Sequence, residues 1–251
     1  MKVVLFGATG YIGGEVLQRC LARPDITAVV TISRRDPGVA AHAKLTVVLH
    51  DNFTHYPDNI LAHFADAGAC IYCLGTNMPV APPELNRKIN FEYALNTART
   101  FASIARRRKE EEKKGLDGSD TGAPAPASPI RFVYNSGAAV EKDASKTLWF
   151  LAQTRKMRGE VENALLALQE EQAAAKNVGF EVVIARPGGV MPQGAVIRTW
   201  LGSKLVMPAI MRGDLGEAMV ELALKGSETV LVENAQLVAI GRAAGSDVKS
   251  S

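Results

Sequence analysis

Cysteine and histidine are scarce in this sequence, which has three cysteines and four histidines among 251 residues. An odd and low cysteine count gives no disulfide framework and is typical of a reducing compartment. The spacing Cys70-Ile71-Tyr72-Cys73 would suit half of a zinc or redox site, but the run is apolar and no second ligand pair follows it. Because free cysteine is usually buried, we expect these thiols in the core. The histidines show no metal-ligand spacing, so no metal is expected.

Charge of one sign and long hydrophobic runs are scarce as well. The net charge is only +3, and the densest basic stretch, 106–114, is interrupted by three glutamates. Nucleic-acid binding is therefore not expected, because it needs clustered lysine and arginine. No apolar run reaches the roughly 20 residues that span a membrane. The first strand pattern begins at Met1, which leaves no room for a targeting segment, so we expect a cytoplasmic protein, with peripheral association with an organelle such as the mitochondrion left open.

What the sequence does have is alternation of strand and helix patterns. With 47% hydrophobic residues it can bury one sizeable core, which predicts one α/β domain over 1–251, a doubly wound Rossmann fold with a mostly parallel sheet. The Gly, Pro, Ser and Asp content of 113–129 indicates a flexible insertion, and 189–251 a small substrate-side extension. The expected strands are 3–6, 26–32, 45–49, 70–74, 130–135, 180–185 and 229–232, and the expected helices are 11–22, 59–67, 85–107, 147–175 and 215–225.

A glycine-rich loop, Gly7-Ala8-Thr9-Gly10-Tyr11-Ile12-Gly13, follows the first predicted strand and opens the first predicted helix. In a dinucleotide site the first glycine permits the tight turn, the second lets the backbone approach the pyrophosphate, and the third lets helix and strand pack closely. The helix N-terminus adds free N–H groups and a positive dipole. The alternative is a plain glycine turn before a helix. Such a turn can occur anywhere in a chain, whereas this loop directly follows a buried strand, as a dinucleotide site requires, so we predict a cofactor site.

The run Ser33-Arg34-Arg35 ends the second predicted strand. A site that prefers NAD usually has an acidic residue there, which binds the ribose 2′-hydroxyl. A guanidinium fork instead suits a 2′-phosphate, so the sequence favours NADP(H). The alternative is that both arginines are only solvated charges at the end of a strand.

Several short motifs in this order resemble the atypical and extended short-chain dehydrogenase/reductases (NAD(P)-binding, NmrA-like). They are most similar to the branch that contains the human Tat-interacting reductase-like protein and its fungal mitochondrial relatives. The resemblance covers about residues 1–192 without the insertion. The motifs are the glycine loop, Thr31-Ile32-Ser33-Arg34-Arg35, Cys73-Leu74-Gly75-Thr76, Asn135-Ser136-Gly137-Ala138, Arg158-Gly159-Glu160-Val161-Glu162 and Arg186-Pro187-Gly188.

The resemblance implies roles at the matched positions. His50-Asp51-Asn52 would contact adenine, and Leu74-Gly75-Thr76 would line the ribose and nicotinamide side. Pro187-Gly188-Gly189-Val190 would hold the carboxamide. Ser136 matches the serine that hydrogen-bonds the substrate carbonyl. Asn90 would either hold a proton-relay water or pack its helix.

The sequence departs from the family at its reductase motif, Tyr-x-x-x-Lys. None of the five tyrosines is followed by lysine four residues later. When the Gly159-Glu160-Val161-Glu162 run is used as the anchor, Thr154 takes the tyrosine position and Arg158 the lysine position. A threonine hydroxyl is a far weaker acid than a phenol, and an arginine holds ribose or phosphate but does not deprotonate. A shifted register that uses Lys156 places Ala152 at the tyrosine position.

Three functions follow from this pattern. The first is an NADP(H)-dependent reductase of a small metabolite whose proton comes from Ser136, water or the substrate. The second is a non-redox isomerase, dehydratase or cyclase, in which Ser136, Thr154, Lys156 and Arg158 would form a polar wall. The third is a non-catalytic NADP(H) sensor or partner-binding protein. The oligomeric state stays open.

The substrate should lie near strand ends on the nicotinamide side, between 78–83, 138–153 and 189–212. Apolar residues in these segments are candidates for the pocket wall, with core or interface packing as the alternative. They are Trp149, Phe150, Met191, Trp200, Leu201, Met207 and Met211.

Overall fold

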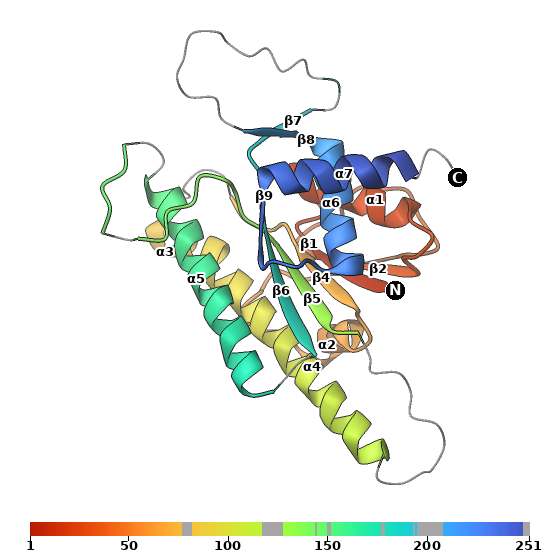
Figure 1. Cartoon of the computed structure of the whole chain (residues 1–251). Helices are drawn as coiled ribbons and strands as arrows, with labels where there is room; N and C mark the ends of the chain where they lie inside the picture. The colour runs from red at the N-terminus through yellow and green to blue at the C-terminus, as the bar shows by residue number, and fades with distance from the viewer. Residues whose placement is uncertain are drawn as a thin grey trace.

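The computed structural model describes residues 1–76, 82–116, 128–143, 145–149, 152–176, 179–192, 194 and 208–247. It confirms a doubly wound Rossmann-type α/β fold (Figure 1). The main sheet has seven strands in the order β3-β2-β1-β4-β5-β6-β9, and all its pairs are parallel. Its strands are β1 Lys2–Phe6, β2 Ala28–Ser33, β3 Leu45–Leu49, β4 Ala69–Tyr72, β5 Ile130–Asn135, β6 Phe180–Arg186 and β9 Leu231–Glu233.

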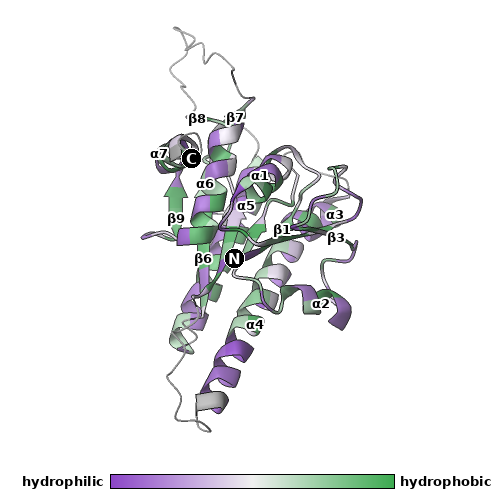
Figure 2. Cartoon of the chain, turned by 90° about the vertical axis from the view of Figure 1, so that its right-hand side faces the viewer, coloured by the Kyte–Doolittle hydropathy of each residue, from purple (hydrophilic) through white to green (hydrophobic). Residues whose placement is uncertain are grey.

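Helices cover both faces of this sheet. One apolar cluster joins a sheet face to α1, α6 and α7, and a second joins the other face to α2, α4 and α5. Figure 2 shows the hydrophobic strands between these layers and the hydrophilic far end of α4. None of the described helices is long and apolar enough to cross a membrane. The helices are α1 Tyr11–Ala22, α2 Asp58–Phe64, α3 Pro83–Arg87, the π-helical turn η1 Lys88–Glu92, α4 Tyr93–Leu116, α5 Ala152–Ala174, α6 Arg212–Lys225 and α7 Asn234–Asp247.

Most of the predicted elements are present, with differences at three places. The predicted helix 147–175 begins later in the structure, at Ala152, and the segment before it contains a turn in which Asp143 accepts hydrogen bonds from the backbone and hydroxyl of Ser145. The predicted flexible insertion 113–129 starts too early, since α4 runs on to Leu116; positions 117–127 lie outside the described residues.

The third difference is at the C-terminal side. A short parallel pair, β7 (Gly189–Met191) and β8 (Ala209–Met211), precedes α6, and α7 follows β9. The sequence analysis did not predict β7, β8 or α7, because strands of three residues have too little periodicity to detect.

The cysteines lie in or against the core, as expected. Cys20 and Cys70 are fully buried, and Cys73 packs against the cluster around α1 and α6. Burial raises the pKa of Cys73 to about 12, so its thiol stays protonated at neutral pH. The Cys70–Cys73 spacing is thus part of a strand end and not a reactive thiolate pair.

Candidate functional site

The glycine loop forms a tight turn between β1 and α1. Gly7 has φ +84°, and a Cβ on it would lie 2.6–2.7 Å from the backbone of Cys73 and Leu74, so only glycine fits. Gly10 N–H donates to the Gly7 carbonyl at 2.9 Å, and a Cβ on Gly13 would overlap that same carbonyl. No side chain caps the start of α1 and its first turn has no acidic residue. Its first N–H groups are therefore available to an anion.

The end of β2 presents two arginines. Ser33 is buried, and its hydroxyl donates to the Arg35 carbonyl at 2.7 Å, which fixes the turn. Arg34 and Arg35 are exposed, and within the described part of the chain neither forms an ion pair. The two arginines therefore lie at the end of β2 with no ion-pair partner in the described residues.

The end of β3 lies against the end of β2, because His50 N–H donates to the Ser33 carbonyl at 2.9 Å. Asp51 and Asn52, the predicted adenine contacts, follow it and are exposed. The Asn52 side-chain oxygen accepts bonds from the hydroxyl (2.6 Å) and the N–H (3.3 Å) of Thr54. The loop therefore has a defined shape beside the two arginines.

The loop after β4, with Leu74, Gly75 and Thr76, is held by an asparagine from η1. The Asn90 side-chain oxygen accepts a bond from Thr76 N–H at 2.8 Å, and its amide donates to Thr76 Oγ1 at 3.0 Å and to the Asn86 carbonyl at 3.0 Å. These bonds tie the Asn90 side chain to the loop after β4 and to its own helix, and both roles considered for Asn90 stay open. A π-helical turn is often found at functional sites, and this one aims Asn90 at the loop.

The turn after β6 is closed by a residue from the far end of the chain. Gly188 N–H donates to the side chain of Asn234 at 2.7 Å, and Asn234 donates in turn to the Ala209 carbonyl at 3.2 Å. A Cβ on Gly188 would overlap the Pro208 carbonyl. The Pro187 carbonyl accepts a bond from Ala138 N–H at 2.7 Å, which joins this turn to the end of β5. Val190 packs against the core on β7.

Ser136 bonds to a buried carboxylate. Its hydroxyl donates to Glu162 at 2.7 Å, and Ser136 is only 3% exposed. Glu162 is fully buried and forms an ion pair with Arg186, which also bonds Glu233 at 2.8 Å. The hydrogen bonds that Arg186 donates to Glu162 raise the pKa of Arg186 above its ordinary value. A substrate carbonyl at Ser136 would have to compete with this internal bond.

Of the predicted catalytic residues of α5, the structure brings Arg158 to the end of β5, beside Ser136. Arg158 lies against Gly137, since a Cβ there would be 2.6 Å from a guanidinium nitrogen. Thr154 is one turn earlier, and both it and Lys156 are partly exposed. The nearby phenol of Tyr134 does not replace the missing tyrosine, because burial raises its pKa and it is only 6% exposed.

The predicted substrate wall is only partly described. Trp149 is fully exposed, so neither core packing nor lining of an apolar wall describes it. Met191 and Met211 are half-buried partners in the β7–β8 pair. Phe150, Trp200, Leu201, Met207 and positions 78–81 lie outside the described residues. Within the described part, no group of histidine, cysteine and carboxylate side chains is placed to hold a metal ion.

Sequence reasoning missed three residues that shape the site. Asn234 closes the Gly188 turn and Glu162 holds Ser136. Arg212 packs its guanidinium 4.9 Å from the centre of the Tyr11 ring in the glycine loop, with Nε 3.0 Å from Glu15. Glu162 stood in a quoted motif, but no local signal indicated its partners.

Comparison with curated proteins finds fungal relatives. No family model matches the chain. Protein fmp52-1, mitochondrial, of Aspergillus terreus is 30% identical over 190 residues, which is 74% of this chain and 66% of that protein. Protein fmp52, mitochondrial, of Aspergillus clavatus is 30% identical over 196 residues, 76% of this chain and 68% of that protein. The match spans about two thirds of each relative's length.

Comparison with solved structures supports the fold alone. The oxidoreductase ylbE from Lactococcus lactis superposes with a TM-score of 0.57 and 14% identity, covering 96% of each chain. A short chain dehydrogenase from Burkholderia cenocepacia J2315 in complex with NADP gives a TM-score of 0.58 and 17% identity, covering 99% of this chain and 94% of that one.

Proposed function

The chain belongs to the Fmp52 family, and from that premise we propose that it binds NADP(H) and uses it to reduce a carbonyl group of a small metabolite. One observation carries the proposal: the uncapped start of α1 and the exposed pair Arg34 and Arg35 lie at the ends of adjacent strands. The first supplies N–H donors for a pyrophosphate and the second supplies charge for a 2′-phosphate. The NADP complex of the Burkholderia dehydrogenase is consistent with this choice of cofactor.

Different residues of the chain bind and orient different parts of the cofactor in this proposal. The glycine loop and Arg34 hold the phosphates, Gly75 and Gly188 line the nicotinamide side, and Arg158 binds ribose. When bound, NADPH supplies the hydride to the carbonyl carbon. The Tyr134 phenol, two residues before Ser136, is buried with a raised pKa, and the Ser136 hydroxyl donates to Glu162. We therefore propose water as the source of the proton that reaches the carbonyl oxygen.

Cofactor binding is tested by comparing NADPH with NADH in wild type and Arg34→Ala. One charge-assisted bond contributes about 1.5–3 kcal/mol, so we expect about 10- to 100-fold weaker NADPH binding and little change for NADH. Equal losses for the two cofactors would refute the 2′-phosphate role. Arg106→Ala, an exposed arginine on α4 that pairs with Glu110, is the matched control and should change neither affinity.

Reduction is tested by mixing the protein with NADPH and a panel of aldehydes, ketones and enones, and following NADPH absorbance. Oxidation that depends on both carbonyl and protein supports the proposal. A substrate converted with no change in the NADPH:NADP⁺ ratio would assign a non-redox enzyme instead.

A second candidate, a non-catalytic NADP(H) sensor, is favoured by the bond between Ser136 and Glu162, which occupies the hydroxyl that a reductase needs. Tight NADPH binding without oxidation across the panel would select it. The names of the relatives carry the word mitochondrial, and we propose the same organelle for this protein. Subcellular fractionation with a mitochondrial marker tests this location.

A further inference from the structure

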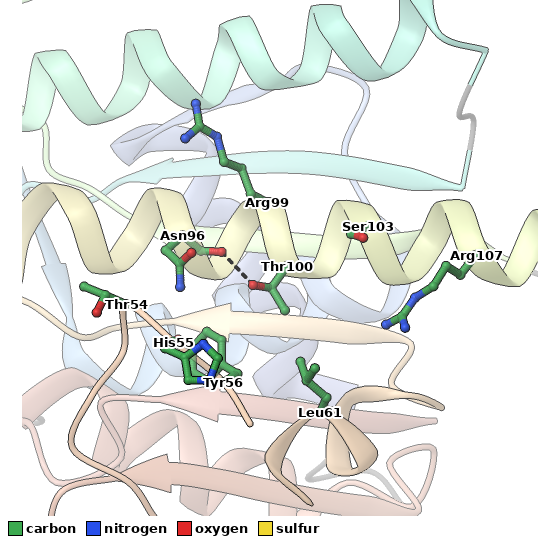
Figure 3. Close-up of a pocket in the computed structure, with 9 residues that line it drawn as sticks. All are labelled: Thr54, His55, Tyr56, Leu61, Asn96, Arg99, Thr100, Ser103 and Arg107. Carbon is green, nitrogen blue, oxygen red and sulfur yellow. Dashed lines mark hydrogen bonds between the residues drawn. The ribbon is translucent and has the colours of Figure 1, made fainter. Parts of the chain in front are cut away.

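A second polar cavity lies on the α2–α4 side of the sheet, separate from the glycine loop. It encloses about 430 Å³ between α4, the loop after β3 and the start of α2 (Figure 3). The α4 residues recur at spacings of three and four, which places them along one side of the helix. The cavity is lined by Thr54, His55, Tyr56, Leu61, Asn96, Arg99, Thr100, Ser103 and Arg107.

The charge of this lining has one sign. Two arginines line the cavity and no aspartate or glutamate does. Within the described residues, neither Arg99 nor Arg107 forms an ion pair. An arginine that lacks an internal carboxylate partner beside a cavity is available to an anionic ligand.

The two arginines next to Arg107 in the sequence both bond to other groups of the protein. Arg106 pairs with Glu110 at 3.8 Å, one turn later on α4. Arg108 donates to the carbonyls of Ala65 (2.7 Å) and Ala67 (2.9 Å), which follow α2. Of these three successive arginines, the one that faces the cavity is the one without such a bond in the described part of the chain.

The wall opposite α4 is fixed by hydrogen bonds. The Tyr56 hydroxyl is 2.7 Å from the Thr97 hydroxyl, and Asn96 donates from its amide to the Phe53 carbonyl at 2.9 Å. Thr100 donates to the Asn96 carbonyl at 2.8 Å. These bonds hold the loop against α4, so the cavity is a built feature of the fold.

The two arginines stand at different places along this wall. Figure 3 shows Arg107 extending from α4 toward Leu61, whereas Arg99 extends from α4 in the opposite direction, away from Leu61 and Tyr56. Eight residues of helix separate their Cα atoms by about 12 Å. Both side chains are exposed, and Arg107 already faces the cavity. The Arg99 side chain lines the cavity edge and has to rotate about its side-chain torsions to contact a second group of the same ligand.

We propose that this cavity binds a small metabolite that carries two anionic groups, phosphate or carboxylate, one for each arginine. The Ser103 hydroxyl lies between them along α4 and can donate to the same ligand. Thr54, on the cavity wall, is bonded to Asn52, a predicted adenine contact. The cavity is therefore next to the cofactor site, and any test has to keep the two apart.

The test is isothermal titration of the NADPH-saturated protein with inorganic pyrophosphate and with citrate, at 150 mM salt to screen weak surface attraction. The variants are wild type, the double variant Arg99→Ala/Arg107→Ala, and the control Arg106→Ala. We expect one binding site in wild type and at least tenfold weaker binding in the double variant. The control should stay within twofold. Thermal unfolding should be nearly unchanged in all three, since exposed side chains are replaced.

Binding that survives in the double variant, or that weakens equally in the control, would overturn the proposal. So would the absence of binding by both probes, or an Arg99- and Arg107-dependent dimer in place of ligand binding. An added Arg34→Ala arm, run without NADPH, separates the two sites. If Arg34→Ala abolishes binding of a probe and the double variant retains it, the probe binds in the cofactor site, and binding to the cavity is refuted. If NADPH itself does not bind, the titration of the cavity with the two probes can still be carried out and interpreted.

Discussion

At the ends of β1 and β2, the first N–H groups of α1 and the side chains of Arg34 and Arg35 have no side-chain partner within the described residues, whereas at the ends of β5 and β6 the polar side chains bond to one another. We call the first region the phosphate half (Gly7–Gly13 and Ser33–Arg35). The second is the catalytic half (Ser136, Arg158, Glu162 and Arg186). The N–H groups of α1 and the two arginines of the phosphate half have no carboxylate to satisfy them in the described chain. In the catalytic half, Glu162 accepts the hydrogen bond of Ser136 and forms the ion pair with Arg186.

This difference separates two kinds of effect. Removal of a polar group that has no partner within the protein lowers the affinity for a ligand. Removal of a buried polar group that is hydrogen-bonded to another lowers the free energy of unfolding. Substitutions in the phosphate half should therefore appear mainly in cofactor affinity, and substitutions in the catalytic half mainly in stability. The following predictions test that division, from the largest expected effect to the smallest.

Glu162→Ala should have the largest effect, because it leaves Arg186 partly buried without its main partner. Removing one member of a buried ion pair typically costs about 3–5 kcal/mol of unfolding free energy, which urea unfolding measures. Glu160→Ala, two residues away on α5, removes only an exposed pair with Arg87 and should cost less than about 1 kcal/mol. A loss below 1 kcal/mol in Glu162→Ala would show that the network does not stabilise the fold.

Gly13→Ala should come next. Its Cβ would overlap the Gly7 carbonyl, so the loop has to shift, at about 1–3 kcal/mol, and NADPH binding should weaken. The neighbouring Gly14→Ala is the matched control, because its Cβ would lie 3.5 Å from the Ala8 carbonyl, an ordinary contact. That variant should be neutral or up to about 1 kcal/mol more stable. Melting curves and NADPH fluorescence on both variants decide the outcome, and equal behaviour would contradict the steric account.

Ser136→Ala should cost about 1 kcal/mol, the usual contribution of one hydrogen bond. Glu162 keeps its bonds to Arg186, so no carboxylate is left unpaired. Cofactor affinity should not change, because the hydroxyl faces Glu162. A large loss of NADPH affinity with unchanged stability would reverse the assignment and place Ser136 in the ligand site.

The smallest effect is expected at an exposed pair outside both halves, Lys2 with Asp66. The hydrogen bond from Lys2 lowers the pKa of Asp66 below 3.8. A lowered carboxyl pKa stabilises the fold above the unfolded value, and that stability is lost as pH falls through the folded pKa. Asp66 is 73% exposed, so solvent screening limits the loss in Asp66→Asn to about 0.5 kcal/mol at pH 7. The difference from wild type should shrink as the pH falls below 3.8 and through the lowered pKa of Asp66, and a difference that stays constant over that fall would exclude the ion pair as its cause.

Local features of the site could be predicted from the sequence and long-range ones could not. The helix 11–22 and the turn at Gly7 follow from neighbouring residues, because glycine and proline mark both boundaries. The bond from Gly188 to Asn234 joins residues 46 positions apart, and no periodic signal predicts it. The Ser136–Glu162 bond likewise depends on how α5 packs against β5. The helix pattern in the sequence begins at residue 147, whereas α5 begins at Ala152, and no local signal in the sequence marks the later start.

The position of Asn234 along the chain has a consequence for the order of assembly. Domains fold broadly from the N-terminus during synthesis, and the glycine loop and its strand partners β2 and β4 are complete within the first third of the described chain. The turn at Gly188 acquires its side-chain acceptor only when residue 234 has left the ribosome. A nascent chain therefore completes the glycine loop long before the turn at Gly188 is closed, and Asn234, the first residue of α7, completes that turn last.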